Sequence, residues 1–235
     1  MSADSQASGT RQDRRKARTR AQILDAAEER FAAVGAELAT IEQIADAADV
    51  AVATVYLHFA KKEDLHLAVV ERALEENERH MLAVYDSDAP PVDKLVDAVG
   101  AYLRFYLESP RLFQVVAMPP GGTSTDTAAL VLSERIDRMT RALAKVIKRG
   151  IDEGTLRGVA PLDTARFLWG ALNGVFALAQ RPDRLRLSDR ELRSALQQGA
   201  EILALGVVTD SQRDADGRLA PKLRNRLRKA IGATK

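Results

Sequence analysis

Apolar side chains recur with helical spacing along almost the whole chain, and this periodicity restricts the fold more than any other feature. The stretch Ile23-Leu24-x-x-Ala27-x-x-x-Phe31, for example, places its apolar residues on one face of a helix. No segment alternates apolar and polar residues as a half-buried strand does. The sequence therefore predicts an all-α protein, and 235 residues are enough to bury a sizeable core.

Local signals divide this helical pattern into elements. Capping-box spacings at Thr19-x-x-Gln22, Thr40-x-x-Gln43 and Ser188-x-x-Glu191 predict helix starts, and Gly35 is predicted to end the first helix. Residues 119–125 are rich in proline and glycine and predict a loop. We expect helices over about 19–34, 40–48, 51–59, 61–82, 92–108, 110–117, 127–153, 161–180 and 188–207.

Charge is distributed unevenly along the sequence. The total is +2, but residues 1–18 carry +3 and residues 210–235 carry +5, which leaves −6 for the body. Two basic ends on an acidic body suggest a polyanionic partner, although solvated, disordered tails would have the same composition. The C-terminal segment also has Leu219, Leu223, Leu227 and Ile231 at helical spacing. This basic amphipathic helix can dock on the body, touch DNA or stay free in solution.

Several classes of function find no support in the sequence. The chain has no cysteine, no glycine-rich phosphate loop and no nucleophile elbow. Its three histidines do not form a ligand set, and Glu63-x-x-His66 alone is a weak motif. We therefore expect no catalytic residue, no metal and no cofactor. No signal peptide and no membrane-spanning run is recognisable, which favours a cytoplasmic protein.

The second and third expected helices are short and joined by the tight turn Asp49-Val50-Ala51, as in a helix-turn-helix. Such a turn needs a residue that tolerates the left-handed conformation, and aspartate is one of the few non-glycine types that does. In this arrangement the second helix braces against the DNA backbone and the third lies in the major groove.

The stretch from Arg18 to Leu65 strongly resembles the N-terminal domain of the TetR family of bacterial repressors. The resemblance rests on four motifs in register: Ile23-Leu24-x-Ala26-Ala27, Phe31-x-x-x-Gly35, Thr40-x-x-x-Ile44-Ala45-x-x-Ala48 and Thr54-x-Tyr56-x-His58-Phe59-x-x-Lys62-Glu63-x-Leu65. Two positions depart from the family pattern. Asp49 replaces the usual turn glycine and adds a negative charge near DNA, and Ala51 replaces a serine that would cap the third helix.

The resemblance also implies which residues contact DNA. Tyr56, His58 and Thr40 would contact phosphates, and Lys62 would add charge at the start of the fourth helix. Val52, Ala53 and Thr54 would meet base edges or thymine methyl groups. The third helix contains no Arg or Lys, so affinity would also depend on a basic arm with Arg14, Arg15, Lys16, Arg18 and Arg20.

In the family, the C-terminal bundle dimerises and holds a small-molecule pocket. By resemblance, the helices over 163–180 and 189–207 would form a four-helix interface with a second copy, although their apolar faces could also be buried within one chain. Aromatic and polar residues suited to an apolar effector pocket occur along the bundle. They are Tyr102, Phe105, Tyr106, Phe113, Met118, Trp169, Asn173 and Phe176. An aromatic residue at such spacing is more often core than ligand pocket.

The sequence thus predicts an all-α protein with an N-terminal three-helix helix-turn-helix bundle and a larger helical dimerisation and ligand-binding bundle. The expected parts are a basic arm (1–18), a DNA-binding domain (19–65), an effector-binding and dimerisation domain (66–208) and a basic tail (209–235). The expected function is a homodimeric repressor that a small hydrophobic effector releases from a palindromic double-stranded operator. The alternatives are a ligand-independent or architectural DNA-binding protein that uses its basic tails, and a protein-interaction module.

Overall fold

The computed structural model describes residues 11–117 and 127–232. Within these ranges it contains ten α-helices, one short 3-10 helix and two isolated β-bridges but no strand, which confirms the all-α prediction. The helices are α1 (Arg11–Leu38), α2 (Ile41–Ala47), α3 (Val52–His58), α4 (Lys62–Tyr85), α5 (Pro91–Glu108), α6 (Pro110–Ala117), α7 (Thr127–Asp152), α8 (Pro161–Ala179), α9 (Asp189–Val207), η1 (Asp210–Gln212) and α10 (Pro221–Gly232). None of the described helices is long and apolar enough to cross a membrane.

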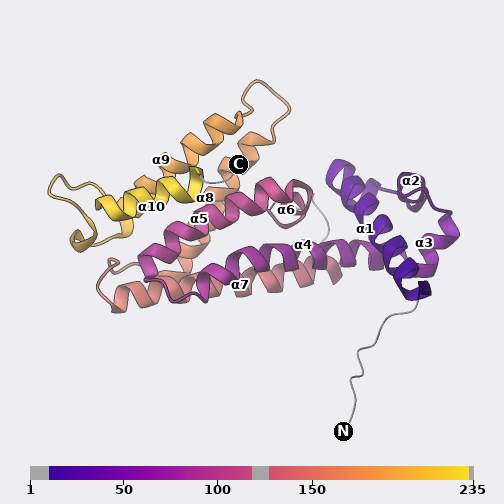
Figure 1. The fold of residues 1–235 in the computed structure, drawn as a ribbon, viewed down its shortest axis with the longest axis horizontal. Coiled ribbons are helices and arrows are strands. Elements are labelled where there is room, and N and C mark those ends of the chain that lie inside the picture. Colours follow the sequence, from indigo (N-terminus) through magenta and orange to yellow (C-terminus); the bar gives the residue numbers. More distant parts are fainter. Residues whose placement is uncertain (1–10, 118–126, 233–235) are drawn as a thin grey trace, which may run out of the picture.

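Helices α1, α2 and α3 form a small bundle at one end of the elongated molecule (Figure 1). Its core consists of the apolar residues that recur at helical spacing, and Ile23, Ala27, Ile44 and Val55 are fully buried there. Burial of a Val, Leu or Ile side chain contributes about 1.5–3 kcal/mol to the free energy of folding, and burial of Ala contributes less. The apolar pattern read from the sequence therefore identified the core of this bundle.

The first helix begins earlier than the sequence predicted. It starts at Arg11 rather than Thr19, so Thr19 lies inside the helix and the predicted capping box there is wrong. Residues 11–18 contain neither glycine nor proline and are rich in Arg, Lys, Gln and Ala, all of which favour helix. The predicted basic arm is thus helical from Arg11 onward. Gly35 has φ 82° and ψ 158°, so the regular helix is interrupted where the sequence placed its end.

The larger bundle contains α4 to α10. Figure 1 shows α4 and α7 running side by side along its length, with α5 beside α4 and with α8 and α9 on the far side of the bundle. Pro91 and Pro161 occupy the first turns of α5 and α8, where a missing N–H costs nothing. The capping box predicted at Ser188 and Glu191 is confirmed at the start of α9.

The basic amphipathic helix α10 docks on the body, packing against α5 and α9. Leu219, Leu223, Leu227 and Ile231 are all buried, as their spacing requires. Gly100 of α5 permits this close approach, because a Cβ there would lie 2.7 Å from the Ala230 carbonyl oxygen. Of the three states that the sequence left open for this segment, docking is the one that the structure shows.

Candidate DNA-binding surface and effector cavity

The turn between α2 and α3 has the geometry that its sequence predicted. Thr40 Oγ1 accepts a hydrogen bond from Gln43 N at 3.3 Å, and Gln43 Oε1 accepts one from Thr40 N at 3.3 Å. Asp49 has φ 53°, which is the expected left-handed conformation. Val50 N then donates to Ala45 O at 3.0 Å. The Thr40 box fixes the start of α2, while the Asp49 turn and the Val50 bond fix the direction in which α3 leaves α2.

Helix α3 buries one face and exposes the other. Val55 lies inward, and Phe59, which caps the helix, is also buried. Ala53 is exposed on the opposite face, together with Tyr56 (48% exposed) and Leu57 (76% exposed). The remaining predicted contact residues on this helix, Val52, Thr54 and His58, are half-buried at the edges of this face. Leu57 is the most exposed of these side chains and was absent from the predicted contact residues, although its position opposite Val55 on a helix indicates it.

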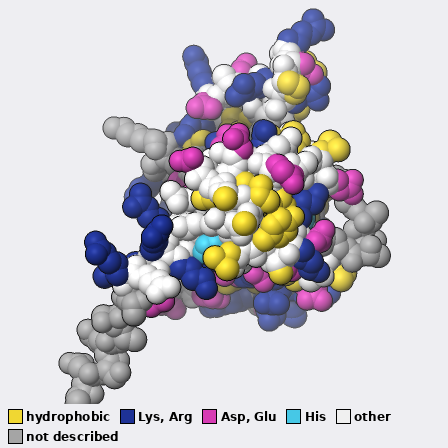
Figure 2. Space-filling view, turned by 90° about the vertical axis from the view of Figure 1, so that its right-hand side faces the viewer, with side chains coloured by type: hydrophobic (Ala, Val, Ile, Leu, Met, Phe, Trp, Pro, Cys, Tyr) yellow, Lys and Arg dark blue, Asp and Glu magenta, His cyan; other side chains and the backbone are white. Residues whose placement is uncertain are grey.

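The basic residues at the start of α1 lie beside α3. The Arg20 guanidinium is 5.0 Å from the centre of the Phe59 ring. Burial lowers the pKa of His58, and the nearby positive charges of Lys16 and Arg20 lower it further. Arg18 is exposed on the same helix. In Figure 2, Lys and Arg side chains gather along one edge of this end of the molecule, around a central group of hydrophobic side chains.

Lys62, predicted from the sequence to add charge near DNA, has an internal role in the structure. Its ammonium donates hydrogen bonds to the carbonyl oxygens of Glu37 and Ala39, both at 3.1 Å. These bonds tie the first turn of α4 to the end of α1 and to the residue before Thr40. A phosphate contact from Lys62 would compete with these bonds, and one from the exposed Thr40 hydroxyl would compete with its hydrogen bond to Glu42.

The larger bundle holds a partly open, apolar cavity of about 150 Å³ between α4, α5, α7, α8 and α9. Most of its lining side chains are aliphatic, with Leu172 from α8, Leu196 from α9 and Leu143 from α7 as examples. Leu227 of α10 reaches the lining as well, so the C-terminal helix forms part of the wall. Arg226 secures that helix to α5 through Asp97 at 2.5 and 2.7 Å and Asp93 at 3.0 Å.

Two of the eight predicted effector residues, Tyr102 and Trp169, line this cavity. Tyr102 OH donates to Asn173 Oδ1 at 2.7 Å and accepts from Trp169 Nε1 at 3.2 Å, so Asn173 supports the wall from behind. Burial raises the pKa of the Tyr102 hydroxyl, so the hydroxyl stays neutral.

The other aromatic residues proposed for the pocket pack on one another instead of lining the cavity. Phe113 and Phe176 have ring centres 5.1 Å apart, and Tyr106 contacts both of them. Phe105 lies 5.8 Å from Phe113 and is fully buried. Aromatic pairs with offset or edge-to-face geometry contribute about 0.5–1.5 kcal/mol beyond their buried area, so this group is a stabilising core. Met118 lies outside the described residues.

Helix α4 contributes to the cavity, which was not predicted from the sequence. Asn77, Met81 and Tyr85, all on α4, line it at intervals of four residues. The Asn77 amide donates to Met139 Sδ at 3.5 Å, but its amide oxygen is buried and has no hydrogen-bond partner. A buried acceptor without a partner is costly, so the cavity favours an occupant that supplies a donor. An asparagine on an otherwise apolar helix face was the signal for this position.

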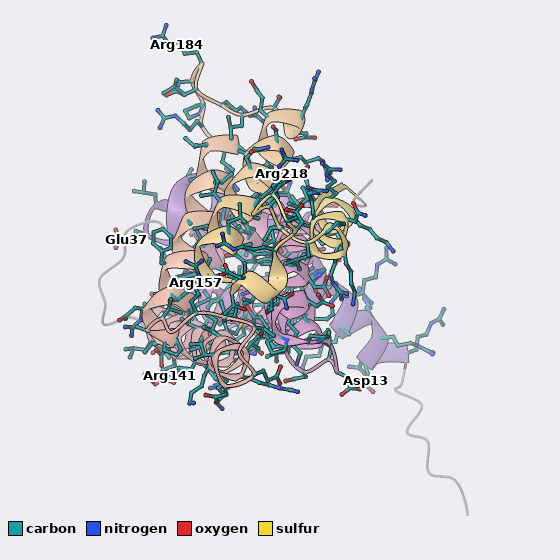
Figure 3. The ribbon with its side chains drawn as sticks, turned by 90° about the vertical axis from the view of Figure 1, so that its left-hand side faces the viewer. Asp13, Glu37, Arg141, Arg157, Arg184 and Arg218 are labelled. Carbon is teal, nitrogen blue, oxygen red and sulfur yellow. The ribbon has the colours of Figure 1, made fainter. Side chains whose placement is uncertain are left out.

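The outer faces of α8 and α9 are apolar but uncovered in the single chain. Phe167 and Ile202 are 62% and 66% exposed and border a shallow groove between the two helices. A Cβ added at Gly170, Gly174 or Gly199 would meet no atom within 4 Å. Figure 3 shows α8 and α9 side by side, with the connection that carries Arg184 extending beyond the bundle. This surface is suited to close packing against another helix pair.

A helix-turn-helix bundle joined through one long helix to a larger helical bundle defines the class of helix-turn-helix regulators. Residues 23–69 match the sequence profile of the bacterial regulatory proteins of the tetR family, and residues 95–202 match that of the tetracyclin repressor-like C-terminal domain. The chain belongs to the TetR family and is a transcriptional regulator of that family.

Known proteins that this chain is similar to include an uncharacterised helix-turn-helix-type transcriptional regulator, YfiR of Bacillus subtilis (strain 168). It is 25% identical over 165 residues, which cover 68% of this chain and 79% of the relative. The crystal structure of AibR with isovaleryl coenzyme A and operator DNA has a TM-score of 0.67 at 19% identity and covers 78% of this chain and 97% of that one. A gamma-butyrolactone receptor has a TM-score of 0.69 at 18% identity, covering 94% and 100%. The two structural likenesses show a shared fold.

Proposed function

We propose that this regulator binds a palindromic DNA operator as a homodimer and that a small, mainly apolar effector in the cavity releases it. The observation that carries the proposal is the course of α4. Its first residue, Lys62, bonds to the helix-turn-helix bundle, and its second half supplies Asn77, Met81 and Tyr85 to the cavity. An occupant that moves α4 therefore also moves α3.

Such a release requires that the effector bind one arrangement of α4 more tightly than another. A dimer makes the consequence large, because both α3 helices must fit successive major grooves of one operator. The uncovered apolar faces of α8 and α9 support a dimer in which these helices form a four-helix interface. In that assembly, a change in the direction of α4 alters the spacing between the two recognition helices.

The lining restricts the chemistry of the effector. The partly open cavity of about 150 Å³ accepts a group of roughly the size of benzene or of a short branched acyl chain. The solved relative AibR binds isovaleryl coenzyme A, which carries such a chain. The unpartnered Asn77 oxygen adds one requirement, a hydroxyl or amide N–H donor on the occupant near α4. We therefore propose an apolar effector with a single donor group.

The alternative of an architectural DNA-binding protein that works through its basic tails has less support. Helix α10 is docked on α5, and the charge of Arg226 is paired with Asp93 and Asp97 rather than presented to solvent. The basic residues that remain exposed around α3 belong to α1 and to the start of α4, where Lys61 lies, while Lys222, Arg228 and Lys229 stay exposed on α10. This distribution favours a defined DNA-binding surface at one end of the molecule.

The proposal can be tested by selecting bound sequences from random duplex DNA. Recovery of one palindrome, protected as a discrete footprint, supports it, whereas uniform coating of all sequences contradicts it. Short-chain acyl coenzyme A thioesters, the matching free acids, hydroxylated acids and amides are then tested for release of the operator.

The active compounds are compared on Asn77→Leu and on Met81→Leu as the matched control. Both variants change a buried lining residue of α4, but only the first removes the polar anchor. We expect Asn77→Leu to bind donor-bearing effectors about tenfold more weakly, as for the loss of a hydrogen bond worth about 1.4 kcal/mol. An equal response of both variants would contradict the role of Asn77.

A further inference from the structure

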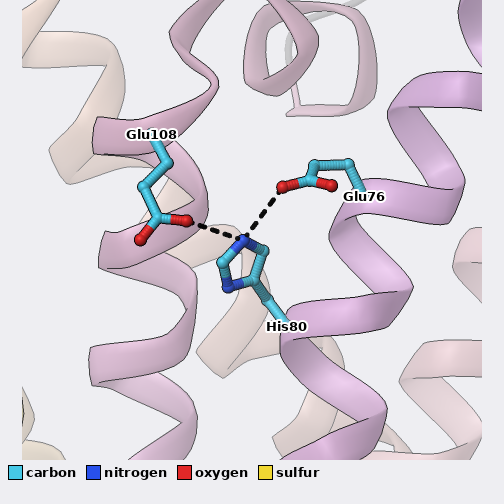
Figure 4. Close-up of side chains that lie close together, drawn as sticks. All are labelled: Glu76, His80 and Glu108. Atoms are coloured by element: carbon cyan, nitrogen blue, oxygen red, sulfur yellow. Dashed lines mark hydrogen bonds and ion pairs between the residues drawn. The ribbon is translucent and has the colours of Figure 1, made fainter.

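Three side chains with metal-binding atoms converge between α4 and the C-terminal end of α5, outside the effector cavity (Figure 4). His80 Nε2 lies 3.2 Å from Glu76 Oε1 and 3.3 Å from Glu108 Oε2, and the three ligand atoms are within 4.8 Å of one another. The His80 side chain is 7% exposed, so packing holds its ring in place. Glu108 is half exposed, which leaves a path from solvent to the cluster.

The polar groups around His80 Nε2 form a compact network that includes Arg79. Arg79 Nη2 lies 3.2 Å from this nitrogen, 2.6 Å from Glu76 Oε1 and 3.9 Å from Glu108 Oε2. Arg79 donates to Glu76 Oε1, and the Nε2–H tautomer of His80 donates to the carboxylates. In the other neutral tautomer, Nε2 presents its lone pair at the point where the two carboxylate oxygens converge, as a metal ligand does.

The ring nitrogen and the two carboxylate oxygens converge on one point, and we propose that Glu76, His80 and Glu108 bind a divalent transition metal, with zinc as the best fit. Zinc takes imidazole nitrogen and carboxylate oxygen at about 2.0–2.1 Å, and the edges of such a tetrahedron measure about 3.3–3.4 Å. The two N–O separations observed here are close to that edge length. The second carboxylate oxygen approaches by rotation of the exposed Glu108, and water supplies the fourth ligand.

Charge also favours a divalent ion at this position. Two carboxylates and a neutral imidazole carry a charge of −2, which zinc balances. The cation now near the centre of the cluster is Arg79, whose side chain is 63% exposed and can turn outward into solvent. Arg79 therefore competes with the metal and does not assist it.

Such a metal would cross-link two parts of the fold. Glu76 and His80 lie on α4, while Glu108 is the last residue of α5 and directly precedes the turn into α6. Helix α6 in turn packs on α1, where Arg111 lies 3.6 Å from Glu29. We therefore expect the bound metal to stabilise the folded chain as well as to bind measurably.

The experiment uses the full-length protein without an affinity tag and freed of metal. Zinc chloride is titrated into it, binding is measured by calorimetry, and stability is measured by thermal unfolding. Glu108→Gln removes an exposed ligand at little risk to folding. Glu75→Gln removes an exposed carboxylate from the same stretch of α4 and is the matched control. His58→Gln excludes binding at a different histidine. Arg79→Ala tests the competing cation.

We expect saturable binding of one zinc per chain, weakened at least about tenfold by Glu108→Gln. Arg79→Ala should tighten it about fivefold, as removal of an exposed ion pair worth about 1 kcal/mol implies. At a fixed zinc concentration, zinc should raise the unfolding temperature of wild type, Glu75→Gln and His58→Gln more than that of Glu108→Gln. Absence of saturable binding, or equal affinities of Glu108→Gln and Glu75→Gln, would overturn the proposal.

Discussion

The C-terminal helix provides a quantitative test of how the cavity is built. Leu227 is buried, lines the cavity and lies next to Arg226, which bonds to Asp97. Leu227→Ala removes three methyl or methylene groups from the wall. We expect this variant to lower the free energy of unfolding and also to change which effectors fit.

The stability loss can be worked out from burial. Three buried carbons at about 0.8 kcal/mol each contribute about 2.4 kcal/mol of transfer free energy. The space left behind adds a cavity term, and buried Leu→Ala substitutions cost about 2.7–5.0 kcal/mol altogether. Leu227 already faces a cavity on one side, so some of its packing contacts are missing before the substitution. The expected loss is therefore about 3 kcal/mol, in the lower part of that range.

Urea unfolding at a fixed protein concentration measures this loss, and Leu223→Ala is the matched control. Leu223 is equally buried on the same helix but does not line the cavity. Both variants should lose stability, whereas only Leu227→Ala should shift effector preference toward longer apolar chains. A loss below about 1 kcal/mol for Leu227→Ala, or the same shift in preference for both variants, would refute the assignment of α10 to the cavity wall.

Three further predictions concern DNA binding and assembly. Burial, Lys16 and Arg20 lower the pKa of His58 in the free protein, while a nearby phosphate would raise it in the complex. Operator affinity should therefore increase as the pH falls from about 8 to about 6, and a binding assay over pH should show no such increase for His58→Gln. Lys16→Gln should reduce the slope of log affinity against log salt by about 0.9, and an unchanged slope would exclude a phosphate contact. Phe167→Glu combined with Ile202→Glu should convert the dimer to a monomer in sedimentation, whereas a persisting dimer would place the interface elsewhere.

The sequence predicted the helix-turn-helix well because its determinants are local. The Thr40 cap, the left-handed Asp49 and the inward Val55 each depend on residues within a few positions along the chain. The predicted start of α1 was wrong because a capping box is a weak signal where the preceding residues also favour helix. Arg11 to Arg18 contain no residue that stops a helix, so the helix extends through them.

The cavity was harder to predict because its lining depends on how helices pack. Large aromatic residues such as Phe105 and Phe113 were obvious pocket candidates, yet their size makes them the residues that fill the core. The cavity is instead lined largely by aliphatic residues, and its polar anchor, Asn77, was hidden in a long helix. The metal cluster shows the same limit, since Glu108 reaches His80 only through the packing of α4 on α5.

The central claim is that the cavity and the DNA-binding surface are coupled through α4, and thermodynamic linkage tests it most directly. Effector affinity is measured by calorimetry for the free protein and for its complex with the selected operator. The proposed function predicts that the operator weakens effector binding about 5–150-fold, by the same factor by which the effector weakens operator binding. Equal effector affinities in the two states would contradict the coupling.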